Sequence, residues 1–276
     1  MSSSKDIKLE VCVDSIASAI AAAESGAARL ELCSALSEGG LTPTIGILKS
    51  LKGFIAIPIY CMLRPRSGDD FIYTDYEMQA MLTDLDMLRE QGADGFVFGS
   101  LTPTRSINVK QCQQVLEHAQ GLPVTFHRAF DITDMTRMQE TVRQIVELGF
   151  KRILTSGFKP SAHEGIEYIA QLIAKNHRDI IIMPGAGIRV GNLEEILTTT
   201  KCIEFHSSAK SKADAPPACN NITLTASDNN VIASSNLSMD CDVISTSRQD
   251  LLMYEMTDAN VVRKLVFIAK AMSEKN

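Results

Sequence analysis

Two short apolar stretches of the chain each carry a carboxylate and a thiol two residues apart. The stretch KLEVCV contains Glu10 and Cys12, and RLELCS contains Glu31 and Cys33. Side chains alternate along a β-strand, so residues two apart lie on the same face. If the two stretches are neighbouring strands, they place two carboxylates and two thiols on one surface. Thiolates are ligands for soft metal ions, and carboxylates can transfer protons.

Polar residues also end three later strand-like stretches. IPIYCMLR carries Arg64, PVTFHRAFD carries His127 and Asp131, and CIEFHSS carries His206. Arg64 and the neighbouring Arg128 could clamp a carboxylate or a phosphate. Six residues are therefore candidate catalytic groups for acid–base chemistry on a small anionic molecule: Glu10, Glu31, Arg64, His127, Asp131 and His206.

Each of these side chains also has an ordinary structural role open to it. A histidine such as His127 is often a hydrogen-bonded core residue, and Arg64 could form an internal ion pair with Glu31. Met62 could lend a thioether to a soft ion, although a methionine in a strand usually fills core space. His127 and His206 could instead complete a zinc site. The convergence of several polar residues on one edge favours function over a wholly structural interpretation.

Eight strand-like stretches alternate with eight helical ones and must position these residues. Three helical stretches end in a glutamate followed two residues later by glycine, at Gly26, Gly92 and Gly149. Glycine enters the left-handed conformation that ends a helix at little cost. Thr74 with Glu77 fits a capping box at the start of another helix. One βα module used repeatedly is the simplest interpretation.

A single series of eight βα units in 276 residues predicts an α/β fold, a TIM-type (β/α)8 barrel in one domain. An open doubly wound sheet is the alternative, but no GxGxxG motif follows the first strand. In a barrel the leucines and valines between the polar residues face the helices. The polar residues then face inward, with Cys12 and Cys33 near the carboxyl-terminal rim.

The loop MPGAGIRVGN follows the seventh strand-like stretch. Barrels often bind phosphate near this position through backbone amides. Gly185, Ala186 and Gly187 could offer such amides to an anion, although a tight turn explains the glycines equally well.

Composition excludes several classes of protein. The formal net charge of −6, without a long basic run, argues against nucleic-acid binding. No stretch approaches the roughly 20 apolar residues of a membrane span, and the first residues lack an apolar signal region. The seven cysteines show no CxxC pair, as expected of free thiols in a reducing compartment. We therefore expect a soluble intracellular protein.

A polar segment at about 208–245 interrupts the alternation before the last helix. It is rich in Asn, Ser and Asp and contains Cys219 and Cys241. Asp228, Asn229 and Asn230 favour a hairpin turn within it. The rest of the segment is expected to form a long loop or a contact with another subunit.

The motifs LEVCVDS, ELCS…EGGLTP, MLRPRSGDDFIY and TFHRAFD together resemble the CutC family of copper homeostasis proteins, in particular its eukaryotic members. The resemblance covers nearly the whole chain and implies a TIM-type barrel. It implies Cu(I) binding through cysteines that match Cys12 and Cys33, and a homo-oligomer, either a tetramer or a dimer. It implies a cytoplasmic location and allows a nuclear one. The segment after Ser208 departs most from the family pattern.

Three hypotheses about function follow from these observations. The first is a copper homeostasis protein that binds Cu(I) through two cysteines at the barrel mouth. The second is an enzyme of unknown reaction that acts on a small carboxylate or phosphate at the rim. The third is a barrel without activity that serves as a subunit of an assembly through its late polar segment.

Overall fold

The computed structural model of the protein describes residues 6–212 and 255–275. Strands and helices alternate along the described chain, and three short 3-10 turns lie between them. Their bounds are β1 Lys8–Val13, α1 Ile16–Glu24, β2 Arg29–Leu32, η1 Leu36–Glu38, α2 Ile45–Lys52, β3 Ile59–Met62, α3 Asp75–Glu90, β4 Gly95–Phe98, α4 Val109–His118, β5 Val124–Phe126, η2 Arg128–Ile132, η3 Met135–Arg137, α5 Met138–Leu148, β6 Arg152–Thr155, α6 Ile166–Asn176, β7 Ile181–Pro184, α7 Leu193–Thr200, β8 Glu204–Ser207, β9 Lys210–Lys212, β10 Glu255–Thr257 and α8 Ala259–Lys275.

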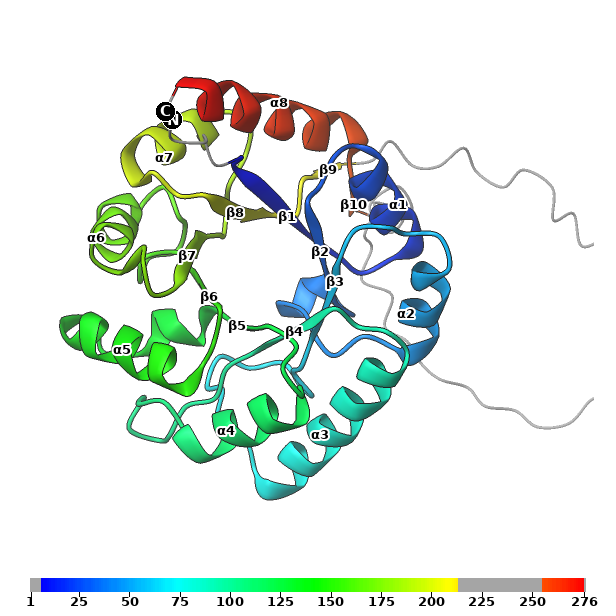
Figure 1. Ribbon diagram of the computed structural model, residues 1–276, viewed down its shortest axis with the longest axis vertical. Coiled ribbons are helices and arrows are strands. Elements are labelled where there is room, and N and C mark those ends of the chain that lie inside the picture. The colour runs from blue at the N-terminus through cyan, green and yellow to red at the C-terminus, as the bar shows by residue number, and fades with distance from the viewer. Residues whose placement is uncertain (1–5, 213–254, 276) are drawn as a thin grey trace, which may run out of the picture. The chain divides into compact units, whose positions relative to one another are not determined.

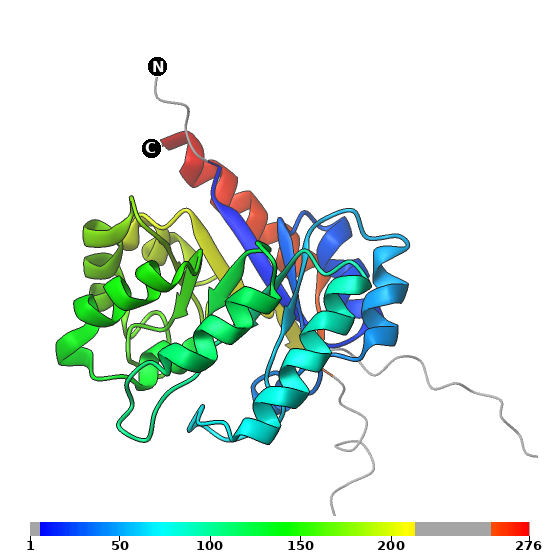
Figure 2. The same cartoon turned by 60° about the horizontal axis from the view of Figure 1, so that its bottom comes forward.

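The first eight strands form one parallel sheet that curls into a barrel, with the helices in a ring outside it (Figure 1; Figure 2 gives a second view). The strand order is β7-β6-β5-β4-β3-β2-β1-β8. Strands β7 and β8 lie side by side but are not joined by a backbone ladder, so the barrel is nearly closed. The predicted (β/α)8 barrel is confirmed. Strands β9 and β10 pair separately in a two-stranded sheet.

Alternation along the strands separates the dry core from the barrel interior. Leu9, Val11, Leu30 and Leu32 are buried in the large apolar core that the strands share with the helices. The residues between them on β1 and β2 are Glu10, Cys12, Arg29 and Glu31. Burying charged side chains between sheet and helices would be costly without partners. The polar residues therefore face inward, as the sequence predicts.

The strand registers arrange the inward side chains in four layers, each drawn from alternate strands. Neighbouring strands of a tilted barrel are offset by about one residue for each step around it. From the amino-terminal to the carboxyl-terminal end of the strands, the layers are Arg29, Gly95, Arg152 and Glu204; Glu10, Tyr60, Thr125 and Met183; Glu31, Val97, Leu154 and His206; and Cys12, Met62, His127 and Gly185.

Local signals in the sequence account for several helix ends. Gly26, Gly92 and Gly149 all have positive φ angles, between 90° and 103°, as predicted for residues that end helices. Thr74 and Glu77 form a complete capping box at the start of α3. No helix within the described ranges is long and apolar enough to cross a membrane. Most of the predicted 208–245 insertion, with Cys219, Cys241 and the proposed hairpin, lies outside the described residues.

Candidate functional site

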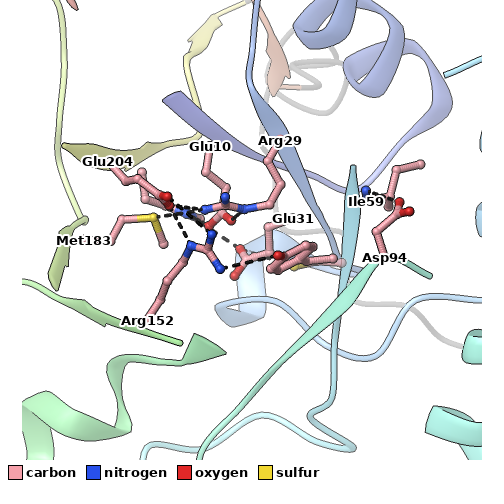
Figure 3. A network of polar contacts seen from close by, with 11 residues as sticks. Glu10, Arg29, Glu31, Ile59, Asp94, Arg152, Met183 and Glu204 are labelled. Atoms are coloured by element: carbon pink, nitrogen blue, oxygen red, sulfur yellow. Dashed lines mark hydrogen bonds and ion pairs between the residues drawn. The ribbon is translucent and has the colours of Figure 1, made fainter. Parts of the chain in front are cut away.

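The amino-terminal half of the barrel interior holds a network of ion pairs, which we call the inner ion network. It comprises Arg29, Glu10, Glu204 and Arg152, together with Tyr60, whose ring contacts both guanidinium groups. Arg29 forms one salt bridge to Glu10 and a second, of 2.8 Å, to Glu204. Arg152, on β6, approaches Glu204 from the other side of β8 than Arg29, with Nε 2.7 Å from Oε2. Both guanidinium groups also lie over the Tyr60 ring, at 4.8 and 5.5 Å. Figure 3 shows the two arginines converging on Glu204.

Mutual pairing keeps the inner ion network charged despite its burial. Burial alone would raise the pKa of Glu10, but Arg29 and His206 outweigh it and lower that pKa to about 2. Burial would also raise the pKa of Glu204, but Arg152 and Arg29 outweigh it and lower that pKa. Charges removed from water are tolerated only with such partners.

A second group, the mouth cluster, lies above the network toward the carboxyl-terminal end of the strands and comprises Cys12, Glu31, Cys33 and His206. One potential ligand atom from each of Cys12, Glu31 and His206 lies within 4.8 Å of the others. His206 Nδ1 is 2.8 Å from Glu10 Oε1, and its Nε2 is 3.6 Å from Glu31 Oε2. Glu10 thus orients the imidazole so that Nε2 faces the cluster.

Burial and proximity perturb the protonation of the mouth cluster. Burial is the main reason that the pKa of Glu31 rises to about 7, and the nearby Glu10 carboxylate adds to it. Burial disfavours the charged form of His206, but Glu31, Cys12 and Glu10 outweigh this and raise the pKa of His206. The cluster therefore places a histidine whose charged form is favoured beside a carboxyl group whose neutral form is favoured by burial. Such perturbed groups are typical of functional sites.

Cys12 and Cys33 both turn into the barrel, as predicted, and their strands are hydrogen-bonded neighbours. Cys33 packs with Tyr60, Met62 and Val97 in a small apolar cluster inside the barrel. Its thiol donates to Glu31 Oε2 at 3.7 Å. Burial, followed by Glu31 and Cys12, raises the pKa of the Cys33 thiol. Cys33 is therefore linked to the other three residues of the mouth cluster through Glu31.

The predicted alternative of an Arg64–Glu31 ion pair is wrong. Arg64 instead donates from Nη1 to the backbone oxygens of Glu38 and Gly40, at 2.7 and 3.1 Å, and from Nη2 to that of Gly68, at 2.8 Å. Among the described residues, Glu31 contacts His206 and Cys33. The register explains the difference, because Arg64 follows β3 and lies beyond the layer of Glu31.

Asp131 lies in η2 and His127 directly after β5, so the two take separate positions at the rim. Asp131 accepts hydrogen bonds from Thr155, from the backbone and side chain of Ser156 and from Phe158 N–H, and it pairs with Arg128. It thereby fixes the loop after β6. His127 is buried on the inner face, across the barrel from Cys12 in the same layer.

The loop after β7 is built partly as a structural turn. Gly185 donates its N–H to Thr155 O at 2.9 Å, so one of the three predicted anion-binding amides belongs to the strand pairing. Ala186 and Gly187 both have a φ of 71°. A side chain at Gly185 would meet Leu154 Cδ1 at 2.5 Å, so glycine is required there by packing. Anion binding by Gly185, Ala186 and Gly187 stays a prediction.

Sequence reasoning did not single out Arg29 and Arg152, the two cations of the inner ion network. Both stand at the first position of a strand. Arg29 is two residues before Glu31, so strand alternation alone places it on the inner face. Glu204 shares that relation with His206 on β8. Extending the alternation backwards from Glu31 and His206 would have identified Arg29 and Glu204, whereas no candidate residue on β6 leads to Arg152.

The fold and the site define a (β/α)8-barrel protein with a buried thiol, imidazole and carboxyl cluster at the carboxyl-terminal end of its strands. A sequence model described as the CutC family matches residues 7–211. The chain belongs to the CutC family, as its motifs suggested. The copper homeostasis protein cutC homolog of Drosophila melanogaster is 58% identical over 273 residues, covering 99% of this chain and 98% of that protein.

Two further relatives lie at greater distance. The copper homeostasis protein cutC homolog of Homo sapiens is 46% identical over 208 residues, which are 75% of each chain. A crystal structure of CutC from Streptococcus agalactiae superposes with a TM-score of 0.70 at 32% identity, covering 73% of this chain and 98% of that one. That structure supports the barrel independently of the sequence motifs.

Proposed function

We propose that the protein acts in copper homeostasis by binding Cu(I) as its cargo in the mouth cluster. The observation that carries the proposal is the convergence of Cys12, Glu31 and His206, with donor atoms within 4.8 Å of one another. Relatives named as copper homeostasis proteins support the choice of metal. Cu(I) favours soft thiolate and imidazole donors, which Cys12 and His206 supply.

The remaining residues assist these two donors. Cys33 is the candidate second thiol. It donates a hydrogen bond to Glu31, so Glu31 can accept the thiol proton when the Cys33 sulfur binds the metal ion. Glu10 holds the His206 ring from behind at 2.8 Å, which is the arrangement that commonly orients metal-binding imidazoles. The inner ion network in turn fixes Glu10 through Arg29.

Anaerobic Cu(I) titration of the full chain against a competing chelator tests the proposal. We expect Cys12→Ser to weaken Cu(I) binding most, followed by His206→Asn and Cys33→Ser. Glu10→Gln should weaken it by about 10- to 100-fold, the usual cost of losing a group that orients a ligand. Cys112→Ala is the matched control, since Cys112 is also buried but lies on α4.

Two results would contradict the proposal. Unchanged Cu(I) affinity in both Cys12→Ser and Cys33→Ser would exclude these thiols as ligands. Tighter binding of Zn(II) than of Cu(I), measured in parallel, would favour zinc as the metal, with Cys12, Glu31 and His206 as ligands instead of the predicted pair of His127 and His206.

Assembly and location are further proposals that rest on the family resemblance. Self-association as a dimer or tetramer would appear as a multiple of the 30.1 kDa chain mass in light scattering. A cytoplasmic or nuclear location would be visible by microscopy of tagged protein. Neither result bears on the copper ligands.

A further inference from the structure

Three buried polar atoms without a hydrogen-bond partner face the barrel interior. Of the six such side-chain atoms found in the described part of the chain, these are Glu31 Oε1, Thr125 Oγ1 and His127 Nε2. An unsatisfied buried polar atom is costly, so its presence calls for a partner that the chain alone does not supply. His127 is the informative case, because it lies outside the mouth cluster and only 3% of it is exposed.

The hydrogen bond at the other ring nitrogen fixes the tautomer of His127. Nδ1 accepts the backbone N–H of Ala129 at 3.1 Å, so it cannot carry a proton of its own. In a neutral imidazole the proton must then be on Nε2. Burial lowers the pKa of His127 to about 3, with Arg64 and Arg128 adding to the effect, so the ring is neutral at physiological pH. Nε2 is thus a donor and has no lone pair for a metal ion.

The charges around His127 favour a negative partner for that donor. Arg64 and Arg128 are the charged groups that act on its imidazole, and both are cationic. The guanidinium of Arg64 donates hydrogen bonds to backbone oxygens. None of these bonds goes to a carboxylate, so no negative charge compensates the guanidinium through them. Arg128 is paired with Asp131.

Phe71 from the loop after β3 holds the imidazole in place. Its ring lies 4.8 Å from that of His127, and the Arg64 guanidinium lies 5.6 Å from the centre of the Phe71 ring. Phe71 has a φ of 51°, an unfavourable conformation for a bulky residue. Its carbonyl accepts Leu101 N–H at 2.8 Å, which helps to hold that conformation. Strained residues of this kind concentrate at ligand sites.

We propose that the barrel mouth binds a small oxyanion, a carboxylate or a phosphate, that accepts a hydrogen bond from His127 Nε2. The site is distinct from the mouth cluster, because it uses β5 and the loop after β3 rather than the thiols of β1 and β2. It does not depend on whether copper binds. His127 binds the anion as a neutral donor, and the positive charge comes from Arg64.

Nuclear magnetic resonance of the full chain with ¹⁵N-labelled histidine tests this proposal directly. The chain has five histidines, and the spectrum of His127→Gln assigns the His127 signals. We expect Nε2 to stay protonated from about pH 5 to pH 8. Titration with acetate and separately with inorganic phosphate should shift the Nε2 signal saturably for at least one of them, with sodium chloride at matched ionic strength as control. The anion that shifts it identifies the class of ligand.

Two substitutions separate the donor from the rest of the ring. His127→Gln keeps an N–H donor near the Nε2 position and should retain anion affinity within a few fold. His127→Asn keeps only a group near Nδ1 and should lose about tenfold or more, the usual cost of a hydrogen bond to a charged group. Thermal melting confirms that each variant is folded.

Several outcomes would overturn the proposal. One is a wild-type Nε2 that is unprotonated or that neither anion shifts, a result for which the His127→Gln variant serves only to assign the signal. Another is equal anion binding by His127→Gln and His127→Asn. Loss of anion binding in Cys12→Ser would show that the anion and the proposed copper ligands share one site, whereas retention is the expected result and leaves the copper proposal to its own titration.

Discussion

The two ends of the barrel interior differ in how completely their buried charged and polar groups are paired. In the inner ion network each guanidinium and carboxylate has an oppositely charged partner, and Glu204 binds two arginines. Nearer the carboxyl-terminal end, Glu31 keeps one oxygen without a partner, and His127 keeps one nitrogen. Both regions are largely buried, and the Arg152 side chain, the most exposed of these, is 13% exposed. Burial alone therefore does not distinguish a structural polar residue from a functional one; between the ion pairs of the network and the charged groups of the mouth, the difference lies in the completeness of hydrogen bonding.

The difference assigns a role to each end. The saturated network fills space that apolar residues fill in many barrels and fixes the positions of Glu10 and, through it, His206. The unsaturated end retains donors and acceptors for a ligand. This division agrees with the general placement of barrel sites at the carboxyl-terminal ends of the strands.

The largest effect is expected from Arg29→Met. The substitution keeps the length of the side chain but leaves Glu10 and Glu204 each without one buried partner. Breaking a buried ion pair in this way costs on the order of 3–5 kcal/mol in the free energy of unfolding. Urea denaturation monitored by circular dichroism measures it.

Arg137→Met is the matched control for that variant. Arg137 also pairs with a glutamate, Glu140, but both side chains are more than half exposed. The free energy of unfolding should then hardly change. Equal effects of Arg29→Met and Arg137→Met would remove the distinction between the network and an ordinary surface pair.

The second prediction uses the opposite pKa shifts of Glu31 and Glu10. The pKa of Glu31 is raised to about 7, so its stabilising contribution is complete below the ordinary value of 4.5 and is lost as pH rises toward 7. Wild-type protein should therefore lose on the order of 2 kcal/mol more stability between pH 5 and pH 8 than Glu31→Gln does. Urea denaturation at both pH values measures the difference.

Glu10→Gln should show the reverse signature. The pKa of Glu10 is lowered to about 2, so its contribution is present above pH 4.5 and disappears as pH falls toward 2. Removing Glu10 should destabilise the protein at neutral pH and flatten the acid side of the stability profile. For Glu31, the contradicting result is a free energy of unfolding that depends on pH in the same way in wild type and in Glu31→Gln. The pKa of Glu31 in the folded protein would then be the ordinary one.

The smallest effect is expected from Thr125→Val. Thr125 is fully buried in the barrel interior, but its hydroxyl has no partner among the described residues. Replacing an unsatisfied hydroxyl by a methyl group of similar shape should change the free energy of unfolding by less than about 1 kcal/mol, or increase it. A loss as large as that of Arg29→Met would show that the hydroxyl has a structural partner, such as a bound water.

Much of the fold could be predicted from the sequence because its signals are local. Strand alternation placed Glu10, Cys12 and Glu31 on the inner face, and the repeated glycines marked three helix ends. The pairing of β1 with β2 also follows from the alternation of strands and helices along the chain. These features depend on residues near one another in the chain, where periodicity and backbone preferences act.

The composition of the site was harder to predict because it depends on register across strands. Strand alternation in the sequence made Arg64 a possible ion-pair partner of Glu31. Because neighbouring strands are offset, Glu31 instead contacts His206, some 175 residues later along the chain. The same offset brings Arg152 to Glu204. No local pattern encodes which layer a residue occupies.

The boundary between β7 and β8 affects how the barrel can open. All other neighbouring strands of the barrel are joined by backbone ladders, whereas this pair is not. Across that gap, Glu204 of β8 pairs with Arg152 of β6, and Ser207 Oγ of β8 donates to Ile188 O in the loop after β7 at 2.9 Å. The wall is therefore held at this boundary by side-chain interactions rather than by the backbone ladder that joins the other strands. We therefore expect amide hydrogen exchange with solvent to start along this boundary, well before global unfolding.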